Sequence, residues 1–287
     1  MIATRDDLHA LLVREGLPRP DLVGRLAAPC LMLSTTRAHR EPSLGEGRIG
    51  GFPDLPVGAV WPHSRAGRPL TFLGQLALET LANAHVAGEL PDQGLLGWYV
   101  DLDGSGPPDF AMTLTPRGVA LERLAPPGSV GVLSACSITM EPAWSLPQGG
   151  YECPFFAALD LGADEREAWD DFLSMWATDH MPEGHQLLGY ASAFNDPYIG
   201  AALDLDEVLR ETWFARPPAG RTRLTDELAD AARAMRLCIE LNEDEAADLD
   251  FGDGTHVSFL LRRDAWSRGR FAQHPPTSEA SIWLEHT

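Results

Sequence analysis

A segment rich in glycine and proline, residues 44–69, restricts the folds open to this chain more than any other feature. It contains six glycines and four prolines, most of them within the stretch 45–62. Proline lacks a backbone donor and breaks helices, and it does not fit a central strand. The segment is therefore expected to be an ordered loop. Four apolar residues are available to pin it to a core: Phe52, Leu55, Val57 and Trp61.

Strands and helices are predicted on both sides of this loop, without regular alternation. Thr4 followed by Asp7 is typical of a capping box and predicts a helix over 4–16. Apolar residues at helical spacing predict a second helix over 164–178. Further helices are expected at 81–86, 205–213 and 225–235, strands at 29–34, 70–78, 95–100, 236–241 and 255–261, and a hairpin between 110–114 and 118–124. This mixture favours an α+β fold of mostly antiparallel sheet units with flanking helices.

Charge and composition exclude several classes of function. The 287 residues include 42 acidic and 22 basic side chains, and every basic one is arginine. Without lysine there is no P-loop lysine and no Schiff base. A net charge of −20 argues against binding to nucleic acid. No apolar run reaches the length of a membrane span, so no membrane association is expected.

The compartment is predicted from the N-terminus and the cysteines. An acidic start, with Asp6, Asp7 and Glu15, is unlike a signal peptide. The four cysteines, at 30, 136, 153 and 238, contain no C-x-x-C pair, as is typical of reduced thiols. A cytoplasmic protein is therefore expected.

Three landmarks recur in the two halves of the chain, which predicts an internal duplication. Each half has a glycine turn with an aromatic residue, a strand carrying one polar residue, and a second glycine turn that leads into an aromatic strand. In the first half the landmarks are 50–52, Gln75 and 91–100. In the second they are 188–190, Glu240 and 252–260. We expect a single domain over 1–287, with repeats at about 28–160 and 161–287, in which Gln75 and Glu240 are equivalent.

The same residues resemble a known family. Arg48-Ile49-Gly50-Gly51-Phe52-Pro53-Asp54-Leu55-Pro56, with Trp61-Pro62, is similar to a motif of the YwqG-like family of uncharacterised bacterial proteins. Four further motifs of that family match 69–75, 90–96, 185–190 and 251–254. This chain departs from the pattern at Glu240, where the family has glutamine, and at Ala191, where proline is usual. The resemblance implies an α+β fold with internal duplication, no named reaction, and an interaction role of immunity or regulatory type.

Established catalytic and metal motifs are missing from the sequence. No G-x-S-x-G elbow is present, and the spacing D-x-D-x-x-D-G at 248–254 fails the EF-hand pattern. His180 and His185 are five residues apart, with proline and glycine between them, which does not suit a zinc site on a helix. No metal and no cofactor are therefore predicted, and no catalytic residue is assigned.

Two functions remain open. The first is a binding module that engages a basic protein partner through the acidic tract 226–253, chiefly Glu243, Asp244 and Glu245, together with Arg48 and Trp61 of the loop. The second is a small-molecule binding protein or enzyme, with a cleft between the two repeats. Its expected lining is Gln75, Glu240, Arg48 and His185. The sequence does not identify a substrate, a partner or an oligomeric state.

Overall fold

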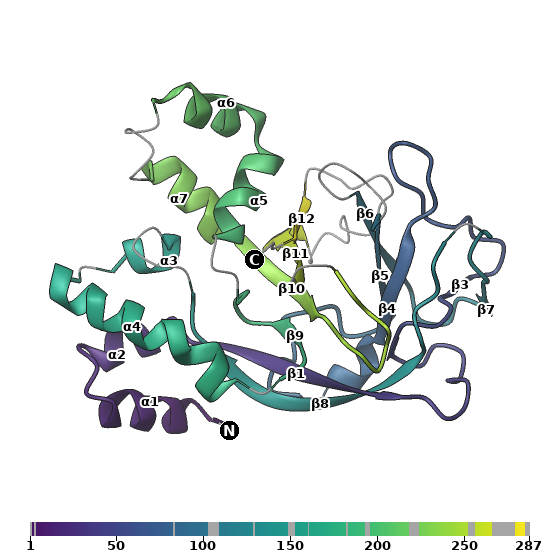
Figure 1. Cartoon of the computed structure of the whole chain (residues 1–287), viewed down its shortest axis with the longest axis horizontal. Coiled ribbons are helices and arrows are strands. Elements are labelled where there is room, and N and C mark those ends of the chain that lie inside the picture. The colour runs from purple at the N-terminus through teal and green to yellow at the C-terminus, as the bar shows by residue number, and fades with distance from the viewer. Residues whose placement is uncertain are drawn as a thin grey trace.

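The computed structural model describes residues 2, 4–82, 84–102, 109–128, 130–148, 153–159, 161–181, 183–192, 196–217, 224–251, 256–265 and 279–284. Within these residues the chain forms a ten-stranded antiparallel sheet, a two-stranded sheet and seven α-helices (Figure 1). The predicted α+β class is thereby confirmed. Helices α1, α2 and α4 lie at one end of the molecule, and the small sheet of β3 and β7 lies at the other (Figure 1).

The helices expected at 4–16, 164–178, 205–213 and 225–235 are formed within a few residues of those bounds, and three further helices of the described residues have no counterpart in the sequence prediction. The helices are α1 (Arg5–Arg14), α2 (Pro20–Gly24), α3 (Pro154–Ala157), α4 (Ala163–His180), α5 (Pro197–Leu205), α6 (Glu207–Ala215) and α7 (Asp226–Arg233). Thr4 caps α1 and Asp7 completes the predicted capping box. The helix expected at 205–213 is α6, which begins two residues later because Asp206 caps it by accepting from the Leu209 amide. The same residue ends α5, which has no counterpart in the sequence prediction. The short helix expected at 81–86 is replaced by a 3-10 turn, η1 (Leu78–Leu81), followed by turns.

The strands of the large sheet form two groups around a central pair. The central strands are β1 (Ala28–Arg37) and β8 (Cys136–Ser145), which pair over their full length. Beside β1 lie β9 (His185–Leu188), β10 (Met235–Asn242), β11 (His256–Arg262) and β12 (Ala280–Leu284). Beside β8 lie β2 (Arg48–Ile49), β4 (Thr71–Ala77), β5 (Leu95–Val100) and β6 (Phe110–Thr115). Each group therefore extends outward in chain order from one central strand.

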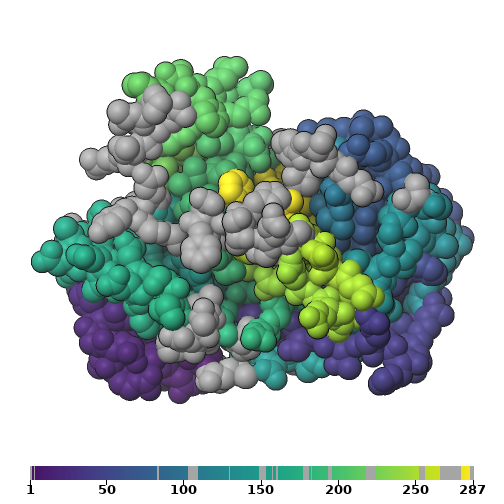
Figure 2. Space-filling model, viewed as in Figure 1, coloured from purple at the N-terminus to yellow at the C-terminus, as the bar shows by residue number. Residues whose placement is uncertain are grey.

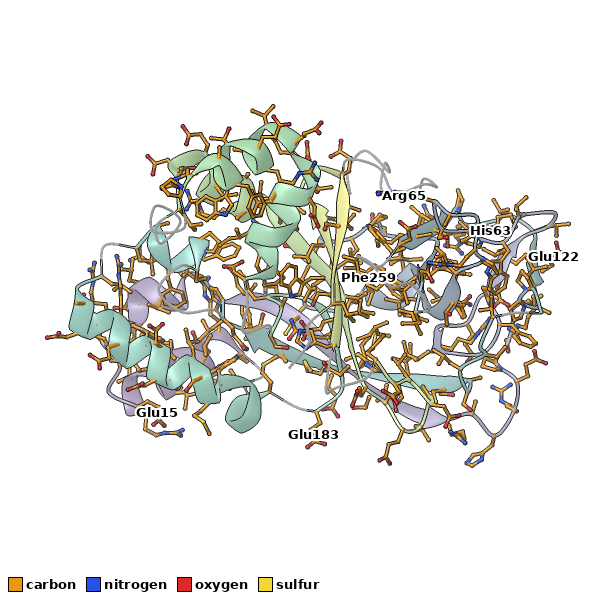
Figure 3. All side chains as sticks on the ribbon, turned by 45° about the horizontal axis from the view of Figure 1, so that its top comes forward. Glu15, His63, Arg65, Glu122, Glu183 and Phe259 are labelled. Carbon is orange, nitrogen blue, oxygen red and sulfur yellow. The ribbon has the colours of Figure 1, made fainter. Side chains whose placement is uncertain are left out.

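The sheet curls around one core and presents its other face to the helices. Phe110 of β6 and Phe259 of β11 pack edge to face, 5.8 Å between ring centroids, although their strands lie towards opposite ends of the sheet. Figure 3 shows Phe259 in the middle of the molecule. A second core joins β10 and β11 to the helices through Trp169 and Trp176 of α4, both fully buried. Burying so much aromatic area makes this second core a main source of stability.

The hairpin predicted between 110–114 and 118–124 is wrong. β6 pairs with β5, whereas β7 (Leu121–Arg123) pairs with β3 (Asp54–Pro56) of the glycine- and proline-rich segment. The apolar side chains of β6, such as Met112, belong to the sheet core, but all three residues of β7 are only half-buried. Two neighbouring segments therefore join different sheets.

The glycine- and proline-rich segment is held by two of its four apolar residues. Leu55 and Trp61 are buried, and the Trp61 indole Nε1 donates to the Leu70 carbonyl at 2.9 Å. Phe52 and Val57 are 36% and 63% exposed, so the expectation that they pin the loop is wrong. Pairing of β3 with β7 replaces the anchoring expected from Val57. None of the helices in the described residues is both long and apolar enough to cross a membrane.

Candidate functional site

A buried polar cluster joins the loop to the sheet through Asp54. Arg48 and Gln75 face each other across β2 and β4, and both contact the Asp54 carboxylate. Arg48 Nη2 lies 2.9 Å from Oδ1, Gln75 Nε2 donates to Oδ2 at 2.9 Å, and Arg123 Nε of β7 donates to Oδ1 at 2.8 Å. Asp54 and Arg48 are almost fully buried. The sequence singled out Arg48 and Gln75, but it missed their shared partner Asp54 and also Arg123.

Hydrogen bonding keeps the Asp54 carboxylate ionised. Burial alone would raise its pKa, but bonds from Arg123, Arg48 and the Gly45 amide outweigh burial and lower the pKa from 3.8 to about 2. Gln75 completes the cluster by accepting from the Asp54 amide at 2.9 Å. These groups use their polar atoms on one another and on nearby backbone, so the cluster holds the loop against the sheet.

Glu240 is the centre of a second buried cluster on β10. Its carboxylate accepts from the Ser192 amide at 3.0 Å, from the Ser192 hydroxyl and from the Ser258 hydroxyl at 2.9 Å. His256 Nε2 lies 3.7 Å away. Gln75 and Glu240 therefore each lie among partners of their own and do not converge in one solvent-filled cavity. The geometry that would favour catalysis by this pair is not formed.

His185 and Asp244 tie the acidic turn after β10 to the sheet. His185 Nδ1 accepts from the Asn242 amide at 3.2 Å, so the proton belongs on Nε2, which lies 3.3 Å from Asp244 Oδ2. Thr35 donates to the same carboxylate oxygen. Burial would raise the pKa of Asp244, but bonds from His185, Thr35 and the Ala246 amide lower it to about 2. Asp244 is thus a structural member of the turn.

The neighbouring carboxylates Glu243 and Glu245 are exposed. They form no ion pair within the described part of the chain, whereas Arg37 of β1 bonds Asp248 at 2.8 Å and the Ala246 carbonyl at 2.9 Å. Figure 2 shows this yellow-green turn at the surface. The turn therefore presents two free negative charges on a braced backbone. Gly252, Asp253 and Gly254, part of the last sequence motif, lie outside the described residues.

A cleft of about 700 Å³ opens elsewhere, between segments of the two halves of the chain. The first half contributes residues 26–29 and 88–91. The second contributes 188–190, Tyr198, 235–237 and Arg263. None of the four residues predicted to line a cleft is among them. The sequence had marked two of the lining segments, Leu90-Pro91 and Leu188-Gly189-Tyr190, but only as turn and family motifs.

The cleft wall at 188–190 is rigid. Leu188 and Gly189 both have left-handed backbone, with φ of 65° and 76°. The Gln186 amide donates to the carbonyls of Leu188 and Tyr190 at 2.8 and 2.7 Å. A Cβ on Gly189 would lie 2.2 Å from Ser145 Oγ, so only glycine fits there. Non-glycine residues with positive φ are strained and persist where the surroundings hold them, often at functional sites.

Two arginines are the cationic groups of the cleft. Arg236 is half-buried at the start of β10, and its Nη1 donates to the Arg233 and Met235 carbonyls, both at 2.7 Å. Arg263 is exposed, and its amide donates to the Ala234 carbonyl at 2.9 Å, which holds it beside β10. The pKa of Arg236 is lowered mainly by burial and, to a smaller extent, by the nearby charge of Arg263. No sequence pattern points to this pair, because neither arginine belongs to a motif.

The remaining chemical candidates are the cysteines, the potential metal ligands and Trp61. All four cysteines are free and buried, and burial raises the pKa of Cys30 and Cys153 to about 12, which disfavours the thiolate at neutral pH. Among the described residues no three His, Cys, Asp or Glu side chains gather in a group that would hold a metal ion. Trp61 is buried beside Tyr99 and serves the core of the loop.

Comparison with known proteins gives one finding. A search of curated proteins returns no match. A family model described as "Domain of unknown function (DUF1963)" matches residues 47–275, most of the chain. The match includes both polar clusters and much of the cleft wall. YwqG-like is the known name of this family, which agrees with the motifs that begin at Arg48. The chain therefore belongs to the DUF1963, or YwqG-like, family of uncharacterised domains.

Proposed function

We propose that this protein binds a small molecule in the cleft between residues 26–29, 88–91 and 188–190. The observation that carries the proposal is the cleft itself, whose volume of about 700 Å³ suits a metabolite-sized ligand. Its wall combines apolar residues, two tyrosines and two arginines. The 188–190 segment is fixed before any ligand arrives, which reduces the entropy lost on binding. The carboxylates of Asp54 and Glu240 are buried and hydrogen-bonded within the fold.

Filling the cleft is expected to abolish binding. Ala28 lines the cleft and is half-buried. The variant Ala28→Trp should lower the affinity of any ligand that binds in the cleft by at least about ten-fold, because the indole would fill the volume that the ligand occupies. To test this, a library of neutral and charged metabolite-sized compounds is screened for binding to wild type by ligand-observed NMR, and each compound that binds is measured again with the variant. Ala59→Trp, at a half-buried alanine of the glycine- and proline-rich segment, is the matched control. Compounds that bind wild type and Ala28→Trp equally well would contradict the proposal, provided both variants melt as folded proteins.

A second candidate, contact with a basic protein segment, is favoured by the turn that carries Glu243 and Glu245. Both side chains are exposed, and the backbone beneath them is braced by Arg37 and by Asp244. Neutralising Asp244 would damage this brace, so it is not a suitable test of surface charge. The two exposed glutamates test the interaction without disturbing the fold.

The variant Glu243→Gln/Glu245→Gln is expected to bind an arginine-rich synthetic peptide about two- to thirty-fold more weakly than wild type, because each exposed charge pair contributes about 0.2–1 kcal/mol. Fluorescence anisotropy at low and high salt measures the effect, which should vanish at high salt. The matched control is Glu207→Gln/Glu211→Gln on the exposed helix α6. Equal loss in both double variants would show that net charge alone attracts the peptide.

We also infer that the fold is a single domain built from an internal duplication. Under this proposal β2, β4, β5 and β6 correspond to β9, β10, β11 and β12. Three details support it. Arg48 pairs with Gln75 as Gln186 pairs with Glu240. Gln75 lies two positions after an irregularity of β4 at Leu73, and Glu240 lies two positions after an irregularity of β10 at Cys238. Both short strands end in a left-handed pair: Gly50 and Gly51 follow β2, and Leu188 is the last residue of β9, with Gly189 directly after it. The test is whether a single rotation superposes the two strand groups in a crystal structure, and opposite strand directions would contradict the duplication.

A further inference from the structure

We infer that the cleft selects a small amphipathic organic anion, whose carboxylate or phosphate group is bound by Arg236 and Arg263. The inference rests on the proposed function and names the class of ligand. Its basis is the juxtaposition of two arginines on the wall of a cleft that several apolar side chains also line.

The two arginines are near one another without a carboxylate to pair them. Within the described residues, neither Arg236 nor Arg263 has an acidic oxygen within 4.0 Å, although the chain carries 42 acidic and only 22 basic residues. Several other arginines of this protein have acidic partners, for example Arg48 with Asp54, Arg37 with Asp248, and Arg233 with Asp230. The two like charges repel one another, Glu89 offsets this only in part, and an anion bound between the arginines would be attracted to both.

The free hydrogen-bond donors of the pair suit an oxyanion. Nη1 of Arg236 donates to the carbonyl of Arg233, the last residue of α7, and to that of Met235, the first residue of β10, which follows α7 (Figure 1). Its Nε and Nη2 have no hydrogen-bond partner in the described part of the chain, and the same holds for the Arg263 guanidinium. A guanidinium offers parallel donors that match the two oxygens of a carboxylate or phosphate. Glu89, also on the cleft wall, adds one negative charge and so disfavours a ligand with many charges.

The rest of the wall indicates an apolar body for the ligand. Leu26, Pro29, Leu90, Leu188 and Leu237 line the cleft. The Tyr190 hydroxyl donates to the Leu26 carbonyl at 2.8 Å, and the Tyr198 hydroxyl accepts from the Ala191 amide at 2.9 Å. Both tyrosines therefore already have polar partners. A ligand with an aromatic or aliphatic body and one anionic end fits this distribution of groups.

Three matched probes test the inference by isothermal titration: benzoate, phenyl phosphate and the neutral benzamide. We expect at least one of the two anions to bind wild type at least about ten-fold more tightly than benzamide, since a charge-assisted bond is stronger than a neutral one. Arg263→Gln should remove most of this preference, and Arg236→Gln/Arg263→Gln should reduce the anions to the level of benzamide. Arg117→Gln, at an exposed turn outside the cleft, is the control for the change in net charge. The better of the two anions identifies the group that is recognised.

The outcomes separate this inference from the proposed function. If benzamide binds as tightly as both anions, and Ala28→Trp abolishes all three, the cleft binds small molecules but the anion inference is wrong. Anion binding that survives the double arginine variant would also overturn it. Should none of the three probes nor any library compound bind in the cleft, both proposals fail. Arg236 also donates to a carbonyl at the end of α7, so its replacement could disturb that helix terminus. The single variant Arg263→Gln leaves this bond intact and therefore tests anion binding alone.

Discussion

Replacement of Asp54 by alanine is expected to destabilise the protein by about 3–5 kcal/mol, the cost of removing one partner of a buried ion pair. The Asp54 carboxylate contacts Arg48, Arg123 and Gln75, and the Arg48 side chain is only 1% exposed. Without the carboxylate, a buried guanidinium keeps only carbonyl partners, those of Glu46 and Phe52. The free energy of unfolding in urea measures the loss. The family motif that begins at Arg48 is therefore expected to be a stability motif.

A matched control separates burial from the loss of an ion pair. Asp230 is 74% exposed and pairs with Arg233 on α7. Asp230→Ala should change the free energy of unfolding by less than about 1 kcal/mol, as is usual for exposed pairs. If Asp54→Ala costs no more than this control, the cluster around Asp54 does not hold the loop.

The same carboxylate predicts how stability depends on pH. The pKa of Asp54 is about 2 in the folded protein and near 3.8 for an unperturbed carboxyl, so the unfolded chain takes up the proton first. The stabilisation is fully present above about pH 4 and is lost as the pH falls towards 2. Wild type should therefore lose more stability over this range than Asp54→Ala does. Parallel curves for the two proteins would show that another group dominates acid unfolding.

Gly50→Ala is expected to cost at least about 3 kcal/mol, because two penalties combine at this position. The backbone is left-handed, with φ of 67°, and a Cβ would lie 2.2 Å from the Ser134 carbonyl oxygen. The Gly50 amide also donates to the Leu73 carbonyl at 2.8 Å, so the turn cannot move away without losing a bond of the sheet. Thermal and urea unfolding of the variant measure the cost.

Gly58→Ala isolates the first penalty from the second. Gly58 has a similar φ of 77°, but open space surrounds its missing Cβ. We expect a loss of about 1–2 kcal/mol there, the ordinary cost of left-handed backbone for an alanine. Equal effects at the two glycines would mean that the approach of Ser134 is relieved by movement of residues 133–135.

The polar clusters show how far sequence reasoning extends into the site. Gln75 and Glu240 attract notice because a polar residue on an apolar strand must find a partner if it is buried. Both are buried and bonded, but their partners come from residues 54 and 192, which no local pattern connects to them. The arginines of the cleft leave even less trace. Arg236 and Arg263 are two among 22 arginines, and only the fold brings them to one cavity.

The amino-acid sequence by itself determined the local structure of this protein: the capped helix at Thr4, the amphipathic helix around Trp169 and the buried strands near Gln75 and Glu240. These features depend on periodicity and turn chemistry within a few residues. The tertiary structure alone decided that β6 and β7 join different sheets, and which residues surround the cleft. Strand pairing and cavity walls are set by packing between segments far apart in the chain, and a strand's own residues do not specify which distant edge gives it the best burial.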